Sequence, residues 1–111
     1  RPSPENAARV FAALAAFGAP LEQHRVTPLM FEAEKYGYRF GTRPNLVEVL
    51  TTISGVDFDT VARDAIAIDL ERRRVRVIGR SSLLANKRAA ARLKDLEDVD
   101  WLERHASKSV P

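Results

Sequence analysis

The stretch from Ser81 to Glu103 constrains the fold most, because its residues repeat at the spacing of two amphipathic helices. Residues three or four positions apart share one side of a helix, and this spacing predicts a narrow buried stripe of Leu83, Asn86, Ala90 and Leu93, with Leu84 beside it. Ser81 or Ser82 is predicted to cap this helix, since a short side-chain oxygen accepts a first-turn N–H. Asp95 is predicted to cap a second helix. The two helices are expected to meet between Arg92 and Asp95.

The same part of the chain divides its charges by sign. Glu71 is followed only by basic charged residues, namely Arg72, Arg73, Arg74, Arg76, Arg80, Lys87, Arg88, Arg92 and Lys94. Acidic residues then dominate, namely Asp95, Glu97, Asp98, Asp100 and Glu103. Most charge runs are solvated faces, so a helical hairpin with exposed charges is the simpler interpretation. A cationic surface beside an acidic helix also suits contact with phosphate, and both interpretations stay open.

Length and composition favour one cytoplasmic domain. A chain of 111 residues with 45% hydrophobic and 30% charged residues supports one modest core, so residues 1–111 are expected to form a single domain. No apolar run approaches the roughly 20 residues of a membrane span, and no membrane partner is expected. The absence of cysteine excludes disulfides and thiolate chemistry. A net charge of +3 permits nucleic-acid binding without requiring it.

The remaining patterns predict an α+β fold. Residues 4–17 form an amphipathic stretch that Ser3 and Pro4 begin and Gly18 ends, as expected of a helix. A short helical segment from Thr27 is followed by alternating patterns that predict strands at 36–40, 45–53, 66–70 and 74–77. Asp57 or Asp59 is predicted to cap a short helix rather than to ligate metal. This order favours a mixed sheet of about four strands with helices packed on it.

Glu48 is the acidic residue that the strand patterns single out. It lies among Val47, Val49 and Leu50 on a predicted strand. A carboxylate buried there requires a charged or hydrogen-bonding partner, or a cation. From the residues alone, a solvent-facing side chain is the simpler expectation.

A longer pattern near the C-terminus resembles a known family. The run Asn86-Lys87-Arg88-Ala89-Ala90-Ala91-Arg92-Leu93-Lys94-Asp95-Leu96-Glu97-Asp98-Val99, called here the C-terminal signature, is similar to that of small bacterial nucleotidyltransferase-fold proteins of the minimal and abortive-infection type. Their usual pattern is Asn-Lys-x-Ala-x-Gly-Arg-x-Lys-Asp-x-x-Asp. Ala91 replaces the glycine, and the charged positions agree.

The resemblance implies that residues 1–111 are one nucleotidyltransferase-like domain, truncated at the N-terminus. The segment Arg1-Pro2-Ser3-Pro4 is similar to the one that leaves the strand carrying two metal-binding aspartates in that family. The chain is therefore expected to begin just after the Asp-x-Asp motif. Magnesium is expected only if the upstream carboxylates are present.

The resemblance also implies a function and its residues. Complete members transfer a nucleoside monophosphate from a nucleoside triphosphate to a hydroxyl acceptor, with two metal ions aligning the phosphate. Glu48 corresponds to the third catalytic and metal-binding carboxylate, which is usually an aspartate. Phosphate charge is expected to meet Lys87 and Lys94, with weaker roles for Arg88 and Arg92, while Asp95 and Asp98 orient these cations. Because the chain lacks the other carboxylates, it is expected to be inactive alone.

A binding or regulatory module is the alternative function. In this hypothesis the basic surface from Arg72 to Lys94 contacts RNA or an acidic protein partner. Unpaired strand edges recruit partners, so the chain is also expected to form a homo-oligomer through an exposed sheet edge.

Overall fold

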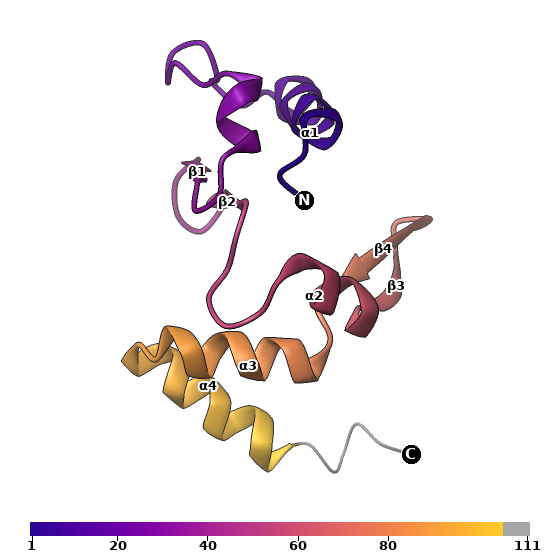
Figure 1. Ribbon diagram of the computed structural model, residues 1–111, viewed down its shortest axis with the longest axis vertical. Coiled ribbons are helices and arrows are strands. Elements are labelled where there is room, and N and C mark those ends of the chain that lie inside the picture. Colours follow the sequence, from indigo (N-terminus) through magenta and orange to yellow (C-terminus); the bar gives the residue numbers. More distant parts are fainter. Residues whose placement is uncertain (106–111) are drawn as a thin grey trace. The chain divides into compact units, whose positions relative to one another are not determined.

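The computed structural model describes residues 1–105, which form two compact units, Arg1–Thr52 and a second unit that begins at Ile53. Figure 1 labels their elements. The first unit contains α1 (Pro4–Phe17), the 3-10 helix η1 (Pro28–Glu32), β1 (Gly37–Phe40) and β2 (Val47–Leu50). The second contains α2 (Phe58–Asp64), β3 (Ile66–Leu70), β4 (Arg73–Val77), α3 (Arg80–Ala90) and α4 (Leu93–Arg104).

The observed elements confirm the α+β class. The strands of residues 1–105 pair as two antiparallel two-stranded sheets, β1 with β2 and β3 with β4, so the single sheet of about four strands is not shown. Each strand pairs with its neighbour in sequence, as short hairpin connections favour. No helix in this range combines the length and apolar content that crossing a membrane requires.

Helix α1 has the predicted boundaries. The Ser3 hydroxyl accepts the N–H of Asn6, Pro4 occupies the first turn, and Gly18 ends the helix with a left-handed φ of 100°. Buried residues of this helix pack with others that follow it to form the core of the first unit, which contains Ala7, Leu14, Leu21, Val26, Phe31, Tyr38 and Phe40. The first unit thus has a core made largely of aromatic and aliphatic side chains.

Helix α2 and the β3–β4 hairpin also follow the sequence predictions. Asp57 caps α2 by accepting the N–H of Thr60 at 2.8 Å. The hairpin turn consists of Glu71 and Arg72, whose φ angles of 47° and 68° are both left-handed. Two positive φ angles are typical of a type I′ turn, which suits the twist of paired strands even though asparagine and glycine are more common there.

Helix α3 begins two or three residues earlier than predicted, and its cap is different. Arg80 is the first helical residue and Gly79 is the N-cap. The carboxylate of Asp64, at the end of α2, accepts the N–H of Ser82 at 2.9 Å and so replaces the expected serine cap. Gly79 is needed because a Cβ there would overlap the carbonyl oxygen of Asp64. The first turn of α3 is therefore fixed by α2.

The junction between α3 and α4 also corrects two predictions. Ala91 ends α3 with a left-handed φ of 53°, and Arg92 is the N-cap of α4, so Asp95 lies at the third helical position. Leu93 was expected in the buried stripe but is 77% exposed, whereas Leu84 is buried. The tight turn at Ala91 changes the helix axis before Leu93, so the spacing that relates Leu93 to α3 no longer applies.

Candidate functional site

A buried carboxylate joins α3 to α4. Asp95 on α4 is only 1% exposed. Its Oδ2 accepts the Arg92 Nε–H at 2.7 Å and the Arg92 backbone N–H at 3.2 Å, and its Oδ1 accepts Arg92 Nη2 at 3.3 Å and Lys87 Nζ at 3.4 Å. Lys87 Nζ also donates to Asp98 Oδ2 at 2.8 Å. We call Lys87, Arg92, Asp95 and Asp98 the charged network.

The protonation of the charged network follows from these contacts. The Arg92 side chain is the main cause that lowers the pKa of Asp95, against the opposing effect of burial, and Lys87 adds to it. The hydrogen bond to Asp98 raises the pKa of Lys87. Both shifts favour the charged forms, because each charge is stabilised by its partners. The charged network is thus a compensated set of ions at neutral pH.

Other residues of the C-terminal signature also make contacts within the second unit. Asn86 Nδ2 donates to the carbonyl oxygen of Ser54 at 3.0 Å, and Arg88 forms an ion pair with Glu103. Lys94 is exposed and forms no ion pair within residues 1–105. Of the four cations predicted to meet phosphate, three are therefore engaged by carboxylates of α4, and Lys94 differs from them.

Glu48 lies on β2 in the first unit, with its side chain 41% exposed. Arg39 faces it across the strand pair, and its Nη2 and Nε lie 3.0 Å and 3.2 Å from Glu48 Oε2. No group of three or more His, Cys, Asp or Glu side chains in the described part of the chain could hold a metal ion. Because Glu48 and the lysines belong to different units, a site shared between them stays a prediction.

Comparison with protein-family models, with curated proteins and with solved structures finds no match.

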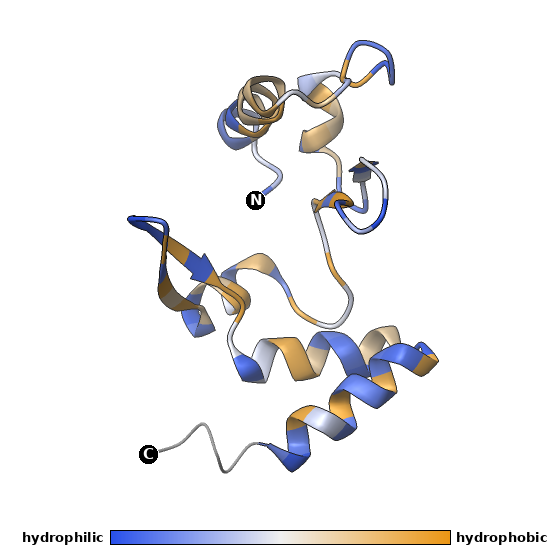
Figure 2. Ribbon diagram, turned by 180° about the vertical axis from the view of Figure 1, so that it is seen from behind, coloured by the Kyte–Doolittle hydropathy of each residue, from blue (hydrophilic) through white to orange (hydrophobic). Residues whose placement is uncertain are grey.

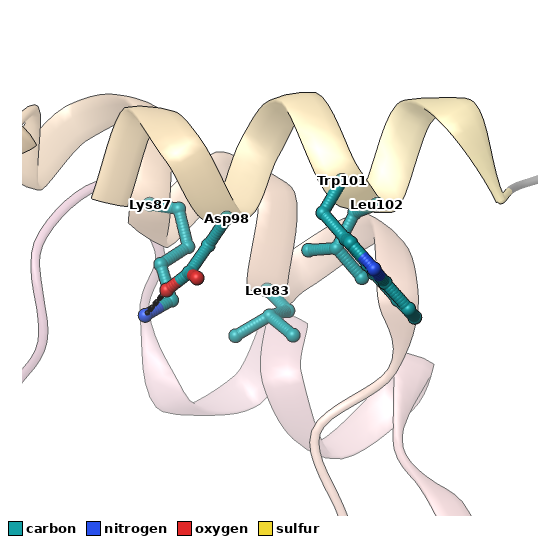
Figure 3. A pocket seen from close by; sticks show the side chains of 5 residues that line it. All are labelled: Leu83, Lys87, Asp98, Trp101 and Leu102. Carbon is teal, nitrogen blue, oxygen red and sulfur yellow. Dashed lines mark hydrogen bonds and ion pairs between the residues drawn. The ribbon is translucent and has the colours of Figure 1, made fainter. Parts of the chain in front are cut away.

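A groove lies between α3 and α4, beside the charged network. It has a volume of about 360 Å³ and is lined by Leu83, Lys87, Asp98, Trp101 and Leu102. Figure 3 shows Leu83 and Leu102 between the Lys87–Asp98 pair at one end and the Trp101 ring at the other. Its size and mainly apolar lining are within the range of small-molecule sites.

Sequence reasoning missed Trp101 and the groove. A signal was available, since Trp101 and Leu102 lie three and four positions after Asp98 and so share its side of α4. Leu83 and Lys87 have the same relation on α3. Which side of α3 faces which side of α4 depends on the turn at Ala91. Sequence spacing does not determine how that turn rotates α4 about its axis.

The β3–β4 hairpin presents a second group of cations, which we call the hairpin arginines, Arg72, Arg73, Arg74 and Arg76. Arg74 lies 3.6 Å from Asp69, with both side chains well exposed, and Arg76 donates to the Ala62 carbonyl oxygen. Arg72 and Arg73 are exposed and form no ion pair among residues 1–105. Figure 2 shows the tip of this hairpin as strongly hydrophilic.

Proposed function

We propose that this chain is a nucleotidyltransferase-like domain and that it does not transfer nucleotides by itself. The charged network supports this proposal most directly. Five polar residues of the C-terminal signature contact one another, or the loop at Ser54, at hydrogen-bonding distances, namely Asn86, Lys87, Arg92, Asp95 and Asp98. The fixed spacing of these charges is explained if they hold α3 and α4 in one arrangement.

The described residues do not fit a two-metal site. Two magnesium ions require several carboxylates, and the Glu48 carboxylate is already bonded to Arg39. Magnesium catalysis is therefore not part of the function proposed for this chain. Lys87, Arg88 and Arg92 are held by carboxylates, which leaves Lys94 as our first candidate for contact with a triphosphate.

Calorimetry with ATP and magnesium tests this proposal. We expect that magnesium does not strengthen ATP binding and that Glu48→Ala binds ATP as the wild type does, since Arg39 rather than a metal ion is the partner of Glu48. Magnesium-dependent binding with a micromolar dissociation constant that disappears in Glu48→Ala would show that the chain carries a working metal site.

RNA binding through the hairpin arginines is the second candidate function. The observation that favours it is a difference in ion pairing between the cations of α3 and the hairpin arginines. Cations in the second half of α3 have carboxylate partners, whereas Arg72 and Arg73 have none among the described residues. A cation without a paired carboxylate can contact a phosphate and does not have to break an ion pair first. An acidic protein is the alternative partner, because it is negatively charged as RNA is.

Titration of the chain with oligouridylate at increasing salt checks this function. We expect binding that weakens as salt rises. We expect Arg73→Gln to reduce the slope of log K against log salt by about 0.7, the value for one neutralised phosphate on a single strand. Arg88→Gln is the matched control, because Glu103 already pairs with Arg88. Binding to polyglutamate but not to RNA would assign the surface to an acidic protein, and equal effects of both variants would contradict the role of the hairpin.

We also propose that the chain self-associates through the β3–β4 hairpin. Within residues 1–105, each strand of this sheet has one unpaired edge, and Ile66, Ile68 and Leu70 are exposed along β3. An isolated two-stranded hairpin is only marginally stable, so a further strand would stabilise it. We expect sedimentation velocity to show association that increases with concentration, and a strict monomer at high concentration would be evidence against it.

A further inference from the structure

The Trp101 ring lies at one end of the groove between α3 and α4. Trp101 is 58% exposed even though an indole ring favours burial. One face of the ring is covered by the His105 imidazole, with ring centroids 4.1 Å apart and planes 20° apart. His105 is held there by Nδ1, which lies 2.7 Å from the Trp101 carbonyl oxygen. The stack gives Trp101 a supported position at the end of the groove.

The other end of the groove offers a hydrogen-bond donor and acceptor side by side. Lys87 Nζ and Asp98 Oδ2 are 2.8 Å apart. In Figure 3, the second oxygen of Asp98 lies on the side of the carboxylate that faces Leu83. An ammonium group donates and a carboxylate accepts, so together they complement a ligand edge that carries an acceptor next to a donor.

We propose that this groove binds an aminated heteroaromatic base of the adenine type. The exocyclic amino group would donate to Asp98 and the adjacent ring nitrogen would accept from Lys87. The planar ring would lie over Leu83 and Leu102 and contact the indole, as bases do on aromatic side chains. A volume of about 360 Å³ accommodates a nucleoside.

Adenine binding in the groove would name the base of the nucleotide in the proposed function, and only this assignment rests on that function. The site involves neither Glu48 nor a metal ion. It can therefore be tested with adenosine, which has no phosphate, in the absence of magnesium. Failure of adenosine binding would leave the ATP experiment unaffected, and the reverse also holds.

Fluorescence of Trp101, the only tryptophan in the chain, reports directly on the groove. We expect adenosine to change this emission saturably, with a dissociation constant on the order of 0.1–1 mM for a ligand of this size. Purine riboside keeps the ring and the sugar but lacks the amino group. It is expected to bind at least about tenfold more weakly, because it cannot make the hydrogen bond to the charged Asp98 carboxylate.

Two variants separate the groove from general helix packing. Asp98→Ala removes the acceptor, and Arg88→Gln removes a different ion pair between α3 and α4 whose residues do not line the groove. We expect adenosine binding to weaken about tenfold or more in Asp98→Ala and to stay within about twofold of wild type in Arg88→Gln. If Asp98→Ala does not fold, the comparison with purine riboside on the wild-type chain decides. No saturable change with adenosine, or equal binding of adenosine and purine riboside, would overturn the proposal.

Discussion

Replacing Asp95 with asparagine is expected to lower the thermal unfolding midpoint of the second unit by at least about 10 °C, because it breaks a buried set of ion pairs. The asparagine side chain has nearly the size of aspartate, so the effect does not come from a cavity. It has one acceptor oxygen instead of two and adds an N–H₂ donor. Both carboxylate oxygens of Asp95 accept from Arg92, and Oδ1 also accepts from Lys87, so some of these donors would lose their partner.

Asp100→Asn is the matched control for this prediction. Asp100 also lies on α4 and pairs with Arg104 at 2.9 Å, but both side chains are well exposed. Exposed pairs of this kind contribute about 0.3–0.5 kcal/mol. Differential scanning calorimetry should therefore show a small shift for Asp100→Asn and a large one for Asp95→Asn. Equal shifts would mean that burial of the carboxylate has no energetic importance.

The pH dependence of stability gives a second measurement on the same variant. Arg92 lowers the pKa of Asp95 below its ordinary value of 3.8 in the folded chain. The stability that results is present above the unfolded-state pKa and is lost as the pH falls through the lowered, folded-state pKa. We expect acid unfolding of the wild type to include this loss and the Asp95→Asn variant to lack it. An identical loss of stability at low pH in both proteins would contradict the ion pair between Asp95 and Arg92.

Gly55→Ala is expected to destabilise the second unit by about 3–4 kcal/mol, through two separate effects. Gly55 has a left-handed φ of 83°, which a side chain disfavours. A Cβ there would also lie 2.6 Å from the Cβ of Ala89 and 2.8 Å from the carbonyl oxygen of Ala85, both on α3. The loop would have to move away from α3, and this movement would break the Asn86 hydrogen bond to Ser54.

Gly18→Ala separates these two effects. Gly18 has a φ of 100°, but a Cβ there would meet no atom within 4 Å. We therefore expect only the conformational cost of about 1–2 kcal/mol for this variant. Urea denaturation of each variant measures the difference. A Gly55→Ala loss no larger than that of Gly18→Ala would show that the loop does not pack closely on α3.

Local patterns predicted the elements because local interactions determine them. Ser3, Pro4 and Gly18 set the limits of α1, and Asp57 caps α2, since each acts on backbone groups within a few residues. The pairing of Glu48 is also local in this sense. Arg39 is its direct neighbour across a hairpin, so a cross-strand ion pair is what the register favours.

Features that join distant segments were not predictable from the same patterns. The cap of α3 comes from Asp64, which is 18 residues before Ser82. The burial of Asp95 and the groove at Trp101 both depend on how α4 turns about its axis after Ala91. A single left-handed residue changes that rotation, and helical spacing carries no information across it. The resemblance implied that Asp95 and Asp98 orient the neighbouring cations, but helical spacing did not predict that Asp95 is buried.

A double-mutant cycle between Lys87→Met and Asp95→Asn most directly tests the claim that the C-terminal signature joins α3 to α4. Thermal midpoints and urea midpoints are measured for the wild type, both single variants and the double variant. Residues in one network couple, so we predict that the double variant is markedly more stable than the sum of the two single losses implies. Losses that simply add would show that Lys87 and Asp95 act independently, and the charged network would then not hold the two helices together.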